Sequence, residues 1–159
     1  MGVSGSGKSS VGQTLARKLG WDFYDADSFH SATAIEKMRR GIPLNDNDRH
    51  PWLKELQSAI TRWLQAGKNT VLACSALKSS YRQILYCQHQ QVKLIYLQGN
   101  FELIFARLKA RQHHFMRANL LQTQFDILEE PKSSEAIYID ISQPIQLIVQ
   151  EIINQLELA

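Results

Sequence analysis

The sequence predicts an α/β fold in which a parallel sheet is covered by helices on both faces. Four short apolar or aromatic segments, near residues 22, 70, 92 and 136, have the composition of strands. Between them stand segments whose apolar residues recur at helical spacing. Because strands that alternate with helices form parallel units, we expect one such sheet. The chain has 159 residues, and we expect a single domain over 1–159.

The first part of the chain is expected to hold three helices and one strand. The first helix ends at Gly20, and the strand "WDFYDAD" ends near Asp25. A short helix follows over 32–40. A long amphipathic helix then takes Asp48 as its N-cap and Pro51 in its first turn. Its expected buried face comprises Trp52, Leu56, Ile60, Trp63 and Leu64.

Three strands and four helices are expected in the remainder. "NTVLACS" is a buried strand followed by the helix "KSSYRQILYCQ", and "QVKLIYLQG" is a strand followed by the helix "NFELIFARLKAR". A polar, histidine-containing segment over 112–118 precedes a helix over about 119–129. The strand "AIYIDI" then leads to a final helix that is opened by Pro144.

Composition narrows the functional class. The formal charge is +3 and basic residues alternate with acids, so no nucleic-acid partner is expected. The two cysteines, Cys74 and Cys87, form neither a disulfide framework nor a zinc cluster, which indicates a reducing, cytoplasmic location. The longest apolar runs are short, so no membrane span is expected.

The stretch from Gly2 to Ser9 matches the phosphate-binding pattern G-x-x-x-x-G-K-[ST]. Its glycines allow backbone N–H groups to turn inward around phosphate oxygens, and the helix that follows directs its positive N-terminus at the same anion. Lys8 is expected to reach the β- and γ-phosphates of ATP, and the Ser9 hydroxyl to reach Mg²⁺. A flexible Gly/Ser tail would explain the composition but not the ordered G-K-S. The predicted ATP-binding residues here are Gly2, Val3, Ser4, Gly5, Ser6, Gly7, Lys8, Ser9 and Ser10.

Two carboxylates follow the first strand. Many phosphate-loop proteins have an acid at the end of a later strand, but Cys74 and Ser75 stand there in this chain. Asp25 and Asp27 are spaced i and i+2, which directs both side chains to one side of an extended segment. One could hold the metal while the other meets an acceptor hydroxyl. Solvated acids at a strand end are the alternative. The absence of N-K-x-D weighs against a GTPase.

Four further segments resemble the bacterial-type gluconate kinases in order and rough spacing: "YDADSFH", "GIPLNDNDRHPWL", "CSALKSSYR" and "HFMRANLLQTQFDILEEP". The resemblance extends from Gly2 to about Pro144. It implies transfer of the γ-phosphoryl group of ATP to the 6-hydroxyl of D-gluconate, with Mg²⁺ as cofactor. It also implies the P-loop kinase fold with strand order 2-3-1-4-5, a mobile lid over about 108–128, and a homodimer.

The resemblance also suggests roles for individual residues. Asp27 would orient and deprotonate the 6-hydroxyl, and Asp25 would bind Mg²⁺ directly or through water. The substrate carboxylate needs a cation, which Arg49, Lys78 or Arg82 could supply, although each could equally be a solvated surface charge. His30 could hydrogen-bond a substrate hydroxyl or serve as a cap.

A second basic group precedes the expected lid. Arg107 and Arg111 lie four residues apart on one helix face. Arg111 is expected to stabilise the charge of the transferring phosphoryl group, and Arg107 to contact phosphate or adenine. A plain amphipathic helix is the alternative. His114 matches the family pattern and is expected to contact substrate, whereas His113 stands where the family usually has a small residue.

Two other functions remain open from the sequence. The fold could serve another small acceptor such as shikimate, although "CSALK" replaces the glycine-rich turn of shikimate kinases. Alternatively, the chain is a truncated, inactive nucleotide-binding protein, because the central strand that normally precedes the phosphate loop is missing from the sequence. Met1 would then be a misplaced start or a boundary.

Overall fold

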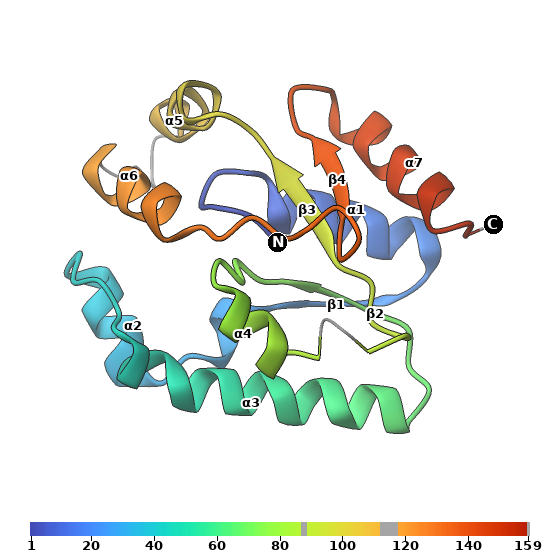
Figure 1. Ribbon diagram of the computed structural model, residues 1–159, viewed down its shortest axis with the longest axis horizontal. Helices are drawn as coiled ribbons and strands as arrows, with labels where there is room; N and C mark the ends of the chain where they lie inside the picture. Colours follow the sequence, from blue (N-terminus) through green and yellow to red (C-terminus); the bar gives the residue numbers. More distant parts are fainter. Residues whose placement is uncertain (87–88, 112–117, 159) are drawn as a thin grey trace.

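Two pairs of parallel strands lie at the centre of the molecule (Figure 1). Strand β1 (Asp22–Asp25) pairs with β2 (Thr70–Ala73), and β3 (Ile95–Gln98) pairs with β4 (Ile137–Asp140). The predicted parallel strands are confirmed, although each is shorter than its sequence segment. The computed structural model describes residues 1–86, 89–111 and 118–158.

The first two residues of the chain run between the strand pairs. The backbone N–H of Leu97 in β3 donates to the carbonyl of Met1 at 2.9 Å. On the other side, the N–H of Gly2 donates to the carbonyl of Ser75, just beyond β2, at 3.2 Å. Met1 and Gly2 therefore lie at the position that the order 2-3-1-4-5 gives to its central strand, and they connect the two strand pairs.

Helices cover the strands on both sides. Helix α1 (Lys8–Leu19) packs on β1, β2 and α7 (Ile145–Gln155), and α7 packs on β4. Helices α3 (Asp46–Gln65) and α4 (Ser79–Ile84) pack together on the opposite side, below the strands in Figure 1. The predicted arrangement of helices on both faces is confirmed.

The remaining helices lie beyond the carboxyl ends of the strands, with α2 and α6 beside the ends of β1 and β2 and α5 beyond the end of β3 (Figure 1). Helix α5 (Phe101–Ala110) packs against α6 (Ala118–Ile127), and α2 (Ala32–Arg39) faces them from the other side in Figure 1. A short 3₁₀ helix, η1 (Ala26–Phe29), was not predicted and joins β1 to the segment before α2. In the part of the chain that the structure describes, no helix is long and apolar enough to cross a bilayer.

The described residues form two apolar clusters in the interior, one on each side of the strands. Adjacent residues of β2 point to different clusters: Val71 packs into the one formed with α1 and α7, and Leu72 into the one formed with α3 and α4. This alternation is the expected result of the two-residue repeat of a strand. Leu56 of α3 and Ile139 of β4 are fully buried in their respective clusters.

The start of α3 differs from the prediction. Its N-cap is Asn45, whose side-chain oxygen accepts from the N–H of Asp48 at 2.8 Å. Asp48 reciprocates by accepting from the N–H of Asn45 at 3.0 Å, which completes a capping box. Asp48 is thus the third helical residue rather than the cap, and Pro51 lies beyond the first turn.

Candidate active site

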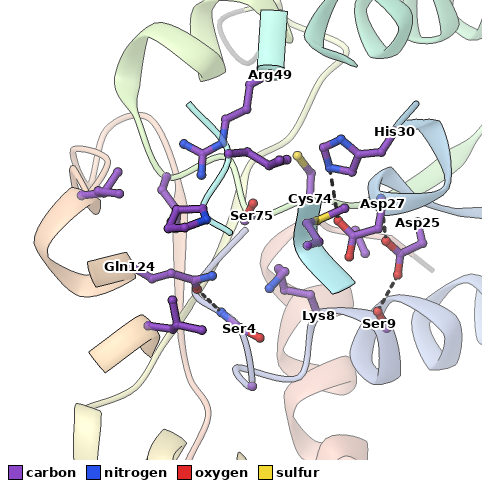
Figure 2. A pocket seen from close by; sticks show the side chains of 18 of the residues that line it. Ser4, Lys8, Ser9, Asp25, Asp27, His30, Arg49, Cys74, Ser75 and Gln124 are labelled. Carbon is purple, nitrogen blue, oxygen red and sulfur yellow. Dashed lines mark hydrogen bonds and ion pairs between the residues drawn. The ribbon is translucent and has the colours of Figure 1, made fainter. Parts of the chain in front are cut away.

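A cavity of about 470 Å³ opens at the carboxyl ends of β1 and β2 (Figure 2). It lies between the phosphate loop (residues 2–9), the segment that joins α2 to α3, and one face of α6. Ligand sites of parallel α/β sheets commonly form at this edge, where loops and helix N-termini converge. Residues that bind nucleotide or acceptor are therefore expected to line this cavity.

The phosphate loop divides into residues that face the cavity and residues that face the interior. Val3 and Ser6 are 3% and 1% exposed and, like Gly2, do not line the cavity. Gly5 adopts a left-handed φ of +81°, and a Cβ built there would lie 2.7 Å from Cγ of Leu108. This position therefore requires glycine on two counts. The predicted loop residues that line the cavity are Ser4, Gly5, Gly7, Lys8, Ser9 and Ser10.

Lys8 holds its ammonium group against the loop itself. Its Nζ donates to the carbonyl of Val3 at 2.9 Å. Burial lowers the pKa of Lys8 below its usual range, and the nearby charge of Asp27 opposes part of this shift. A cation that is desolvated in this way lacks a full set of partners, so an anion in the cavity would be strongly favoured.

Asp25 and Asp27 both line the cavity but have different surroundings. The Ser9 hydroxyl donates to Oδ2 of Asp25 at 2.7 Å, and Oδ1 of Asp25 accepts from the N–H of Asp27 at 3.0 Å. The Asp27 side chain is 82% exposed. The two carboxylates share the cavity because η1 turns the chain after Asp25, and not, as predicted, because the segment is extended. Asp25 is thus fixed beside Ser9, while Asp27 faces the open cavity.

His30 is held in a fixed orientation at the wall of the cavity. Its ring stacks on Trp52, with centroids 4.4 Å apart and planes inclined by 11°. The side chain is only 5% exposed, and its Nε2 lies 3.9 Å from Oδ1 of Asp27. Burial lowers the pKa of His30, and the Arg49 charge lowers it further, while Asp27 opposes both. The folded protein therefore favours neutral His30.

This neutral histidine predicts a pH-dependent loss of stability. Unfolded histidine titrates near pH 6.5, so below that pH the unfolded chain binds a proton that folded His30 does not yet accept. The free energy of unfolding should fall as pH drops from 6.5 towards the lower folded pKa, with a slope of at most about 1.4 kcal/mol per pH unit, the limit for one proton. Thermal unfolding between pH 7.5 and 5.5 should show a steeper decline for the natural chain than for His30→Phe. Equal slopes would contradict this prediction.

Arg49 is the predicted substrate cation that reaches the cavity. Its Nη1 donates to the hydroxyl of Tyr81 at 3.1 Å, and its guanidinium lies over the Tyr81 ring. The Tyr81 hydroxyl in turn donates to Asp46, which also accepts from Nζ of Lys78 at 3.1 Å. Lys78 is engaged in this ion pair and does not line the cavity. Tyr81 and Asp46, which were not predicted to contribute, hold the two cations in place.

Arg82 is buried and bonds to the protein backbone. It is 6% exposed, and its Nη1 donates to the carbonyls of Ala76 at 2.9 Å and Leu77 at 3.2 Å. Ala76 has a positive φ of 45°, so its carbonyl turns away from the direction that strand β2 would give it. Arg82 does not line the cavity, and its role as a substrate cation stays a prediction. It supports the turn between β2 and α4.

The two predicted arginines at the end of α5 also have different surroundings. Arg111, the residue that ends α5, lines the cavity and lies near enough to Lys8 to lower the pKa of that lysine. Arg107 donates from Nη2 to the carbonyl of Ile141 and does not line the cavity, and its phosphate or adenine contact stays a prediction. His114 lies outside the described residues.

Helix α6 contributes a wall that was not predicted. Its residues at positions i, i+3, i+4 and i+7 face the cavity, and the side-chain oxygen of Gln124 accepts from the N–H of Ser4 at 2.7 Å (Figure 2). The helical spacing of this face could have been recognised in "LLQTQFDI", but the sequence carries no sign of what the face packs against. The residues of this wall are Leu120, Thr123, Gln124 and Ile127.

Comparisons with known proteins find similarity to small-molecule kinases over nearly the whole chain. The shikimate kinase family model matches residues 4–157. A probable gluconokinase of Xenopus tropicalis is 44% identical, over 99% of this chain and 91% of that protein. The thermoresistant gluconokinase of Escherichia coli K12 is 44% identical, over 97% of this chain and 89% of its own. The crystal structure of a gluconokinase from Sinorhizobium meliloti 1021 superposes with a TM-score of 0.86 at 41% identity, covering 99% of this chain and 89% of that one.

Proposed function

Because this chain belongs to the shikimate kinase family, and within it to the gluconokinases, we propose that it transfers the γ-phosphoryl group of ATP to the 6-hydroxyl of D-gluconate. The observation that carries the proposal is the convergence of three kinds of group on one cavity. These are the phosphate loop with Lys8, the carboxylates Asp25 and Asp27, and the Arg49 guanidinium. A polyol that carries a carboxylate and receives a phosphoryl group needs all three.

The phosphate loop would hold the nucleotide. N–H groups of Gly5, Gly7 and Lys8 are suited to bind phosphate oxygens, and the Lys8 ammonium would exchange its contact with the Val3 carbonyl for one with the β- and γ-phosphates. The N-terminus of α1 begins at Lys8 and adds its positive dipole. Arg111 could add further positive charge as negative charge spreads over the transferring group.

Ser9 and Asp25 fit a Mg²⁺ ion. Both present hard oxygen atoms, and their mutual 2.7 Å hydrogen bond places those atoms side by side next to the loop. Mg²⁺ usually takes one or two ligands from the protein and completes its shell with phosphate oxygens and water. When bound, the ion would neutralise phosphate charge. The protein's part would be to hold the Ser9 hydroxyl and the Asp25 carboxylate at that place.

The acceptor would occupy the part of the cavity between Asp27 and Arg49. Asp27 is exposed to the cavity and would accept the proton of the 6-hydroxyl as its oxygen attacks phosphorus. Arg49, held by Tyr81, would pair with the carboxylate at the other end of gluconate. Neutral His30, stacked on Trp52, could hydrogen-bond an intervening hydroxyl. Homodimerisation and a cytoplasmic location stay predictions from the sequence.

The proposal is tested by acceptor-dependent turnover. With ATP and Mg²⁺, D-gluconate is expected to be converted to 6-phosphogluconate, with release of ADP. Phosphorus NMR of the product shows which hydroxyl carries the phosphate. Shikimate and D-glucose serve as acceptors that lack, respectively, the open polyol chain and the carboxylate. Turnover of shikimate without gluconate would overturn the proposed acceptor. Nucleotide binding without turnover of any acceptor would favour the inactive nucleotide-binding protein.

A further inference from the structure

Helix α6 is anchored on one face and exposed to the cavity on the other. Leu121 is fully buried in the core, and Phe125 packs against Phe101 of α5, with ring centroids 5.8 Å apart. Just past the helix, the N–H of Glu129 donates to the Leu77 carbonyl at 2.9 Å, the same carbonyl that Arg82 contacts. Gln124 lies one turn after Leu121, at the edge of this packed face, and is therefore presented to the phosphate loop by a fixed support.

The contact with the phosphate loop determines which way the Gln124 amide is turned. A backbone N–H can only donate, so the 2.7 Å contact with Ser4 must be made by the side-chain oxygen. The amide nitrogen is left with two N–H donors, and no described residue accepts from it. Figure 2 shows Gln124 and Asp25 on opposite sides of Lys8. The nitrogen thus borders the space over the loop that the transferring group is expected to cross.

We propose that Gln124 is a catalytic residue of the phosphoryl transfer, whose side-chain amide donates a hydrogen bond to an oxygen of the transferring γ-phosphoryl group; this rests on the proposed function. An uncharged donor suits this position, since Lys8 and Arg111 already supply cations to the same cavity. Donors that are fixed before the reaction stabilise developing charge without a cost of reorganisation at that moment. The anchored α6 and the bond to Ser4 together provide such fixation.

The test uses two substitutions that separate the two ends of the amide. Gln124→Glu keeps an oxygen for the Ser4 N–H but replaces the donor with a second oxygen and adds negative charge. Gln124→Leu removes both the amide oxygen and the amide nitrogen while keeping a side chain of similar size. The matched control is Gln122→Leu on the exposed face of the same helix, where the side chain donates a hydrogen bond to Asp126.

We expect kcat with gluconate to fall by about 10²-fold in Gln124→Leu and by more in Gln124→Glu, as for loss of one fixed donor to a developing oxyanion. In Gln124→Leu the KM values for ATP and gluconate should stay close to those of the natural chain, because the bond forms fully only during transfer. In Gln124→Glu the added negative charge should also raise the KM for ATP. Gln122→Leu should match the natural chain. Melting temperatures and ADP affinity, measured on all four proteins, would show whether the variants are folded and bind nucleotide.

Three results would overturn the inference. Unchanged kcat in both Gln124 variants would mean that the side chain only occupies the loop in the absence of nucleotide. A raised KM for gluconate with kcat retained would assign Gln124 to the acceptor instead. A fall in kcat that is matched by loss of ADP affinity or of folding would assign it to support of the loop. Absence of gluconate turnover in the natural chain would instead refute the proposed function, and is measured first.

Discussion

Replacement of Lys8 by Met is expected to lower kcat/KM for ATP by about 10³-fold, the upper range for loss of one group that stabilises a developing anion. Lys8 belongs to the loop, and among the described residues its Nζ donates to the carbonyl of Val3. The methionine side chain has similar length but carries no charge. The loss should appear in coupled-assay kinetics with gluconate at saturating concentration.

The fold should survive this substitution. Burial already lowers the pKa of Lys8, which means that the surroundings disfavour its charge in the absence of a ligand. Lys8→Met should therefore melt at or above the temperature of the natural chain. Lys18→Met is the matched control, because Lys18 lies on the same helix but bonds to Gln150 on the exposed surface. Turnover by Lys8→Met near the natural rate would exclude the phosphate loop as the ATP site.

Replacement of Asp27 by Asn is expected to lower kcat by about 10³-fold, within the range for loss of a general base. Asparagine keeps the shape of the side chain but cannot take the proton of the acceptor hydroxyl. Because the Asp27 side chain is 82% exposed, the substitution should leave the melting temperature nearly unchanged. The KM for ATP should change less than kcat, since the loop keeps its backbone and Lys8 its contact with Val3, although Lys8 loses the nearby Asp27 charge.

Asp22→Asn provides the control for this second substitution. Asp22 lies at the opposite end of β1, where its carboxylate is 3.8 Å from Nζ of Lys68 on the surface. It should leave kcat unchanged. If Asp27→Asn retained the natural kcat, positioning and charge stabilisation would have to account for the reaction without this base. A large rise in the KM for gluconate alone would assign Asp27 to binding of the acceptor.

The sequence was sufficient for the features that depend on near neighbours in the chain. The phosphate loop is defined by the spacing of its glycines and Lys8, which is a local requirement of the backbone. The alternation of strands and helices follows from short-range periodicity in the same way. The N-cap of α3 was predicted wrongly because Asn45 and Asp48, three positions apart, are both good capping residues. Their reciprocal bonds decide the question, and such a pair can be recognised only if Asp48 is considered as the third helical residue.

Residues whose direction depends on packing could not be placed in this way. Arg49 and Arg82 occur in comparable motif segments, yet Arg49 lines the cavity whereas Arg82 is buried and does not line it. Arg82 is held by the carbonyls of Ala76 and Leu77, and neither these contacts nor the positive φ at Ala76 is visible in composition or spacing. Gln124 was missed for a similar reason, because its partner Ser4 is 120 residues away in the chain.

The position of Met1 and Gly2 affects how the molecule unfolds. These residues bond to the segment after β2 and to β3, and they lead into the loop and α1, which itself packs on both β2 and α7. A nucleotide held by the loop would thus oppose separation of either strand pair from the other. At a concentration of about 100 times its Kd it would add about 2.7 kcal/mol to the free energy of unfolding. Bound nucleotide would therefore make the two strand pairs unfold as one cooperative unit, because the phosphate loop connects them.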